Sequence, residues 1–165
     1  MESIIKLLYF ILPIYFANMA PIFLSKLNFF NKPISKKLLG SHKTWKGFIS
    51  GCLAGMLVAL VQLQFYTGLE IYDYSQPALF GFLLGFGALF GDSFKSFFKR
   101  KIRIKPGKPW IPFDQIDYSI GALVFVSPLI FLGWWNSLII IVLSFLLHIF
   151  ANHLGYWLGI RKIPW

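Results

Sequence analysis

The chain has 165 residues, of which 57% are hydrophobic and 13% are charged. An ordinary soluble domain carries about 25% charged residues, so this composition excludes that class and predicts one all-α integral membrane domain over residues 1–165. The formal charge is +10, but the basic residues lie in short loops between apolar runs. We therefore expect membrane lipids and nucleotide phosphates as partners, and no nucleic acid. The single cysteine, Cys52, excludes an intramolecular disulfide.

Five apolar runs are long enough to cross a bilayer as helices. The first could instead be a signal peptide, but Glu2 and Lys6 leave its start nearly neutral, whereas signal peptides begin with a basic segment. We expect the five spans at about residues 3–24, 47–65, 78–95, 116–134 and 137–158.

The distribution of basic residues predicts the orientation of these spans. Six lysines follow the first run, seven lysines and arginines follow the third, and two basic residues lie close to the end of the chain. The intervening loops, residues 67–76 and the turn around Asn136, contain no Lys or Arg. The positive-inside rule then places the N-terminus outside, the C-terminus in the cytoplasm, and two basic loops on the cytoplasmic face of the cell membrane.

Glycines recur at helical spacing within the second and third runs. Gly47, Gly51 and Gly55 fall on one helix face, and small residues at such positions let helices approach closely. The glycine pairs 81 and 85, and 87 and 91, have the same property. These faces fit either packing within the chain or a homodimer.

Three of the six acidic residues border the second basic loop. Asp92 ends the third apolar run, while Asp114 and Asp117 precede the fourth and share one helix face. In ordinary terms, Asp92 would pair with Lys95 or Lys99, and Asp114 and Asp117 would cap the start of the next helix. A carboxylate at a span is costly, however, and is usually functional. Hard oxygen ligands without a Cys or His cluster predict Mg²⁺, so the three aspartates are candidate catalytic and metal-binding residues.

A second candidate site lies at the start of the second span, at residue 47. Lys43 and Thr44 precede Gly47, and the free N–H groups of a helix N-terminus can bind phosphate there. An ordinary helix start with a snorkelling lysine explains the stretch equally well. Lys99 and Arg100 are at least a positive-inside signal, and Arg100 could also clamp a phosphate.

Three other polar residues in the apolar runs are interpreted as structural. His148 and His153 are five residues apart, which is a poor helical spacing for a metal, so we assign them to packing or hydrogen bonding. Asn18 within the first span is expected to make a hydrogen bond between helices.

The motifs resemble those of the membrane CTP-dependent phosphatidate cytidylyltransferases. Residues 91–100 and 112–117 match that family's pattern of Gly-Asp, a Ser, Lys-Arg and then Asp-x-x-Asp. Residues 43–47 resemble its Lys-Thr-Trp-Glu-Gly motif, with Lys46 in place of Glu. The bacterial-type His-Gly-Gly before the aspartate pair is absent, and Gln115 stands where that type has Arg. The short chain and its Pro-Phe-Asp-Gln-Ile-Asp segment resemble the archaeal branch, the CDP-archaeol synthases.

The resemblance implies a reaction and a set of ligands. CTP and 2,3-bis-O-(geranylgeranyl)-sn-glycerol 1-phosphate would give the CDP-lipid and pyrophosphate, with Mg²⁺, at the cytoplasmic face. It adds a serine of the first motif to the phosphate-binding set, which becomes Lys43, Thr44, Gly47, Ser96, Lys99 and Arg100. The alternatives are phosphatidate as acceptor, a small anion transporter or channel, and a lipid-binding scaffold. A pore would need polar residues in mid-span, where the second to fourth runs have almost none, and a scaffold would not need the three aspartates.

Overall fold

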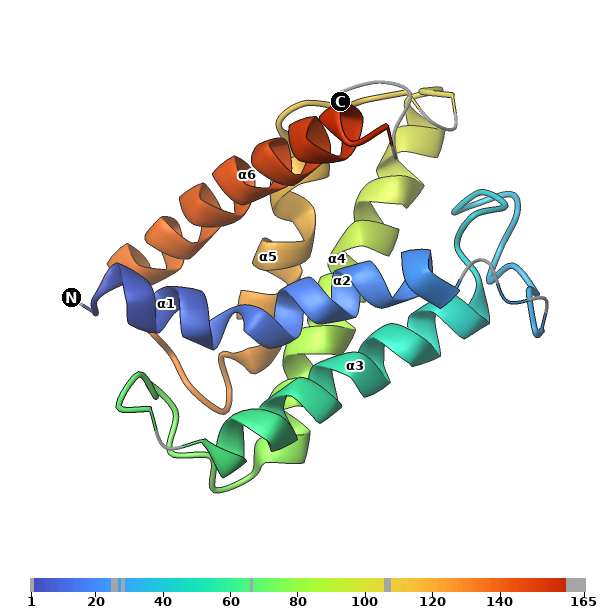
Figure 1. Ribbon diagram of the computed structural model, residues 1–165. Coiled ribbons are helices and arrows are strands. Elements are labelled where there is room, and N and C mark those ends of the chain that lie inside the picture. Colours follow the sequence, from blue (N-terminus) through green and yellow to red (C-terminus); the bar gives the residue numbers. More distant parts are fainter. Residues whose placement is uncertain (1, 25–26, 28, 66, 106–107, 160–165) are drawn as a thin grey trace.

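The computed structural model describes residues 2–24, 27, 29–65, 67–105 and 108–159. All the regular elements in these ranges are helices, which confirms the predicted all-α class, and one isolated bridge joins Pro33 and Thr44. The helices are α1 (Ile4–Phe10), α2 (Leu12–Leu24), α3 (Trp45–Gln64), α4 (Pro77–Lys101), α5 (Phe113–Val126) and α6 (Trp134–Trp157) (Figure 1).

Three helices, α3, α4 and α6, are long and apolar enough to cross a membrane. Helices α1 and α2 meet at a bend of 43° and together would make a fourth span. The predicted helix over residues 116–134 was too long, because α5 stops at Val126. Ser127 still has helical dihedral angles, but Pro128 has no N–H to donate to the carbonyl oxygen of Val124, which accepts the Ser127 hydroxyl at 2.8 Å instead. The missing N–H contributes to ending the helix here. The structure thus supports a multi-pass membrane protein with three or four spans among the described helices.

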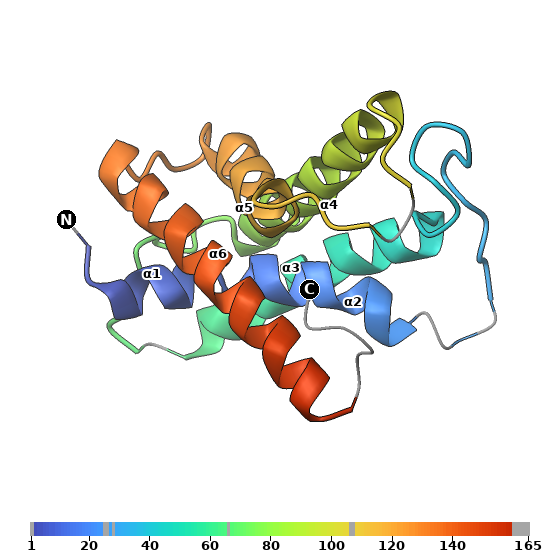
Figure 2. The same cartoon turned by 90° about the horizontal axis from the view of Figure 1, so that it is seen from above.

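Helix α4 lies between α3 and α5, while α2 packs on α3 and α6 packs on α5 (Figures 1 and 2). The core lies where α1, α2, α4, α5 and α6 meet, and its side chains are almost fully removed from solvent. Its large buried side chains include Phe10, Ile14, Phe80, Leu84, Tyr118 and Ile140.

Glycines allow the backbones of α4 and α5 to touch. A Cβ atom on Gly121 would overlap the carbonyl oxygen of Gly87, and a Cβ on Gly91 would overlap the carbonyl oxygen of Asp117. Gly55 and Gly81 meet in the same way between α3 and α4. The expected close approach is therefore present within one chain, and it places the residue after Gly91 beside the first turns of α5.

Because α4 and α5 touch at Gly91, we expect one added methyl group there to have a large effect on stability. Gly91→Ala should destabilise the protein by about 1–3 kcal/mol, because α4 and α5 must move apart. The thermal unfolding temperature of the detergent-solubilised protein measures this effect. Leu79→Ala is the control on the same helix, since Leu79 is 41% exposed and should change that temperature little. An unchanged unfolding temperature in Gly91→Ala would contradict the packing described here.

Candidate active site

Three carboxylates from two helices converge on one ammonium group. Lys95 lies on α4, one turn beyond Asp92, and its Nζ is 3.1 Å from a carboxylate oxygen of Asp92. The same Nζ lies 2.8 Å from Asp114 and 3.0 Å from Asp117, which come from the first turns of α5. The structure thus brings together the three aspartates singled out in the sequence.

Two further lysines complete this charged cluster. Lys99 donates to both carboxylate oxygens of Asp114, at 3.0 and 2.9 Å, and to the carbonyl oxygen of Lys108 at 2.6 Å. Lys43, from the loop before α3, forms an ion pair with Asp92. The backbone N–H of Trp110 also donates to Asp114, at 2.6 Å. Three carboxylates are therefore matched by the ammonium groups of three lysines.

The carboxylates of this cluster do not have the geometry of a metal-binding site. Among the residues that the structure describes, no group of three or more His, Cys, Asp or Glu side chains has a geometry that could hold a metal ion. The Lys95 ammonium lies where the three carboxylates meet instead. The donor set itself, three hard carboxylate oxygens, is the kind that Mg²⁺ prefers.

The loop before α3 is fixed at its base, which positions Lys43. The N–H of Ile34 donates to the carbonyl oxygen of Lys43 at 2.8 Å, and the N–H of Trp45 donates to that of Lys32 at 3.1 Å. Burial lowers the pKa of Lys43 to about 8, so its side chain remains mostly charged at neutral pH.

Thr44 is the N-cap of α3, and its hydroxyl oxygen accepts the N–H of Gly47 at 3.1 Å. Thr44→Ala should therefore lower the free energy of unfolding by about 1 kcal/mol, whereas Thr44→Ser keeps the acceptor and should change it little. Thermal unfolding of the two variants in detergent measures the difference. Equal unfolding temperatures for Thr44→Ala and Thr44→Ser would show that the cap does not contribute.

Two other expected phosphate ligands bond to backbone groups. The Ser96 hydroxyl donates to the carbonyl oxygen of Asp92 at 2.8 Å, and Arg100 donates to the carbonyl oxygen of Ile104. The side chains of both thus have partners on or beside α4. Among the six expected phosphate ligands, Lys43 and Lys99 pair directly with the aspartates.

Two cavities with charged lining residues adjoin the charged cluster. The first, here the central polar cavity, has a volume of about 260 Å³, and the second, the side cavity, about 360 Å³. Asn18 and Asp92 line both of them. The central polar cavity also contains Lys95, Lys99, Lys108, Asp114, Asp117, His148 and Asn152, and the side cavity contains His42, Lys43, Thr44, Gly47 and Ser93.

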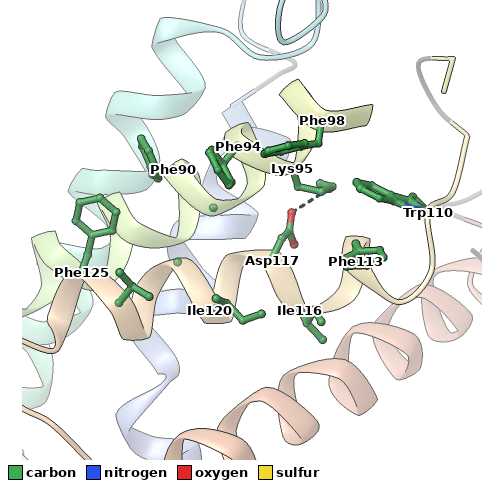
Figure 3. A pocket seen from close by; sticks show the side chains of 13 residues that line it. Phe90, Phe94, Lys95, Phe98, Trp110, Phe113, Ile116, Asp117, Ile120 and Phe125 are labelled. Carbon is green, nitrogen blue, oxygen red and sulfur yellow. Dashed lines mark ion pairs between the residues drawn. The ribbon is translucent and has the colours of Figure 1, made fainter. Parts of the chain in front are cut away.

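An apolar groove of about 440 Å³ runs between α4 and α5 (Figure 3). Its charged lining residues, Lys95 and Asp117, point toward each other beside Trp110 and Phe113, and Phe125 lies at the far end (Figure 3). The walls are otherwise aromatic and aliphatic, with Phe90, Phe94 and Phe98 at successive turns of α4 and Ile116, Ile120 and Val124 on α5.

A second apolar groove, of about 450 Å³, lies between α5 and α6. Ile120 and Val124 of α5 line both grooves, so the two adjoin across this helix. The outer groove extends to Phe131 and Trp134. One apolar surface thus leads from the Lys95–Asp117 pair to the start of α6.

Comparison with known proteins identifies the family. The family model described as CarS-like, CDP-archaeol synthase, matches residues 1–165. The chain belongs to the CDP-archaeol synthase family. The CDP-archaeol synthase of Thermococcus kodakarensis is 36% identical over all of this chain and 98% of its own length. The CDP-archaeol synthase of Pyrococcus horikoshii is 34% identical over 100% of this chain and 99% of its own length. That of Methanococcoides burtonii is 36% identical over 79% of this chain and 83% of its own length.

A solved structure resembles this CDP-archaeol synthase family member over most of its length. Its description reads "Structural insight into an intramembrane enzyme for archaeal membrane lipids biosynthesis". The TM-score is 0.71 and the identity 27%, over 92% of this chain and 96% of the other. The resemblance drawn from residues 41–117 is therefore confirmed, and the chain is a nucleotidyltransferase of the membrane.

Several residues of the candidate site in this CDP-archaeol synthase family member were not predicted from its sequence. Asn18 was expected to make a hydrogen bond between helices, and His148 was assigned to packing or hydrogen bonding, but both line the central polar cavity together with Asn152. Lys95 was considered only as a partner of Asp92, although it contacts all three aspartates. The sequence feature that could have indicated Asn18, His148 and Asn152 is an amide or imidazole side chain within an apolar run. Such a side chain is costly in a membrane, and it is usually retained because it takes part in a functional site.

Proposed function

We propose that this chain, as one transmembrane domain, transfers CMP from CTP to 2,3-bis-O-(geranylgeranyl)-sn-glycerol 1-phosphate and releases pyrophosphate. The observation that carries the proposal is the convergence of Asp92, Asp114 and Asp117 on Lys95, which together with Asp117 lines an apolar groove. Carboxylates suit a magnesium ion, the lysines around them suit phosphates, and the groove suits an isoprenoid chain.

The transfer needs no covalent intermediate on the protein. A phosphate oxygen of the lipid attacks the α-phosphorus of CTP, a new P–O–P bond forms, and the bond to the β-phosphate breaks so that pyrophosphate leaves. The chain orients the two anions and stabilises their negative charge. The three aspartates would hold Mg²⁺, which supplies charge neutralisation on the phosphates when bound.

We assign CTP to the central polar cavity and the side cavity, which share Asn18 and Asp92 as lining residues. Lys95, Lys99 and Lys108 line the central polar cavity and suit the triphosphate. Lys43, with Thr44 and Gly47 at the N-terminus of α3, lines the side cavity and supplies a further phosphate contact. Ser96 and Arg100 stay in the proposed set, although each must leave a backbone carbonyl to reach a phosphate.

We assign the lipid acceptor to the apolar groove between α4 and α5. Its phosphate lies at Lys95, and one isoprenoid chain extends past Phe94 and Ile120 toward Phe125. The groove between α5 and α6 adjoins it through Ile120 and Val124 and offers space for the second chain. Both chains then remain within the apolar layer while the phosphate reaches the aspartates.

We further propose five spans, an outer N-terminus and a site at the cytoplasmic face. CTP is cytosolic, and the basic loops before α3 and after α4 flank the proposed site. Helix α5 and the segment to Gly133 would form the fifth crossing.

The glycine faces considered for a homodimer pack within the chain, which accounts for them without a second copy.

Acceptor choice is tested with purified protein, CTP and a panel of lipid phosphates. The ether-linked geranylgeranyl lipid phosphate should accept CMP in the presence of Mg²⁺ and not with EDTA, and ester-linked phosphatidate should react far more slowly. Equal rates with phosphatidate would support the alternative acceptor. Uptake of a labelled anion into proteoliposomes without any lipid product would support the transporter alternative instead.

A further inference from the structure

The ammonium group of Lys95 occupies the point where the three aspartates meet. Its Nζ lies between 2.8 and 3.1 Å from one oxygen of each carboxylate, and the Lys95 side chain is 13% exposed. Asp117 is more buried still, at 7%. A positive group at this position is needed, since three carboxylates so close together would otherwise raise one another's free energy.

A magnesium ion and this ammonium group cannot occupy the point together. Mg²⁺ binds carboxylate oxygens at about 2.0–2.1 Å, whereas the Lys95 ammonium nitrogen lies 2.8 to 3.1 Å from them, as in close ion pairs. The carboxylates are therefore spaced for a lysine, which agrees with the absence of a finished metal site among the described residues. A bound cation would require Lys95 to leave and the carboxylates to move inward.

Lys95 has room to leave, and its position suggests where it goes. It lines both the central polar cavity and the apolar groove, so it stands at the junction of the proposed sites for CTP and lipid. The neighbouring Lys99 differs, because it contacts Asp114 alone among the aspartates and is also bound to the carbonyl oxygen of Lys108.

We propose that Lys95 is a positioning residue that takes the place of the cation in the metal-free protein. It holds the three aspartates together until a divalent cation binds, and its ammonium group then turns to a substrate phosphate at the junction of the two cavities. This inference rests on the proposed function, because it takes the aspartates to be the metal ligands.

The test measures binding of Mn²⁺, a paramagnetic substitute for Mg²⁺, to purified protein without CTP. Lys95→Met removes the competing charge, so the dissociation constant for Mn²⁺ from electron paramagnetic resonance should fall by about tenfold or more. In EDTA the same variant should unfold at a lower temperature than the wild type, and Mn²⁺ should raise that temperature by more than it does in the wild type. Lys99→Met is the matched control and should show a smaller change in both measurements.

The outcomes separate this inference from the proposed function. Tight Mn²⁺ binding by the wild type with no gain in Lys95→Met would overturn the role of Lys95 alone. No Mn²⁺ binding in either protein would overturn it together with the metal part of the proposed function. If folded Lys95→Met is recovered only when Mn²⁺ is present, this would support the exchange of the Lys95 ammonium group for a divalent cation. The affinity for Mn²⁺ is then measured with Lys95→Gln, which is neutral but still forms hydrogen bonds.

Discussion

Asp117→Asn should lower the rate of CMP transfer by about 10²–10⁴-fold, because the loss of charge neutralisation at the phosphates costs several kcal/mol in the transition state. Asp117 is the most buried of the three aspartates and also lines the apolar groove, so it lies where the two substrates would meet. Asparagine keeps the size of the side chain but not its charge. The rate of CDP-lipid formation at saturating CTP measures the effect.

Two controls make this result specific. Asp73→Asn makes the same chemical change in the loop before α4, where the carboxylate accepts the N–H of Ser75, and it should leave the rate unchanged. Thermal unfolding and gel filtration should show that Asp117→Asn is folded. Wild-type activity in folded Asp117→Asn would remove this residue from the active site.

Val124→Trp should lower kcat/KM for the lipid acceptor by about 10²-fold, since a displacement of the reacting phosphate by about 1 Å can have that cost. Val124 is 61% exposed and lines both apolar grooves, so an indole there obstructs the path of the isoprenoid chains. The effect is steric, because the chains leave a bilayer that is as apolar as the groove. The KM for CTP should stay the same.

A series of acceptors with geranyl, farnesyl and geranylgeranyl chains sharpens this prediction. A geranyl chain has half the carbon atoms of a geranylgeranyl chain, so less of it has to pass Val124, and Val124→Trp should affect the geranyl acceptor less than the geranylgeranyl acceptor. Leu57→Trp is the matched control, since Leu57 is 61% exposed on α3 and lines neither groove. An equal loss with all chain lengths would place the acceptor outside the groove.

The helices and the acidic cluster follow largely from local sequence. Apolar runs of spanning length predicted both ends of α3 and α6 and the start of α4 within three residues. Helix α4 continues to Lys101, six residues beyond the predicted end, because its last turns are basic and not apolar. Glycine spacing predicted the close contacts of α4. The end of α5 was missed because residues 127–134 are apolar like the run before them. Composition indicates that a segment lies in an apolar environment, whereas the missing N–H of Pro128 contributes to where the helix stops.

The arrangement of the site depended on tertiary contacts that sequence spacing cannot supply. Helical spacing relates Lys95 to Asp92, but its contacts with Asp114 and Asp117 exist because Gly91 and Gly121 let α4 and α5 touch. Asn18, His148 and Asn152 belong to α2 and α6, far apart in sequence, and each has an ordinary structural explanation by itself. Their common role becomes visible only where the helices enclose one polar cavity.

The most direct test of nucleotidyl transfer follows the phosphorus atoms of CTP. Purified protein is incubated with Mg²⁺, the geranylgeranyl lipid phosphate and CTP labelled at either the α- or the γ-phosphorus, and the lipid is then extracted. We expect the α-label in the lipid product and the γ-label in pyrophosphate. A γ-label recovered in the lipid, or neither label there, would contradict CMP transfer by this site.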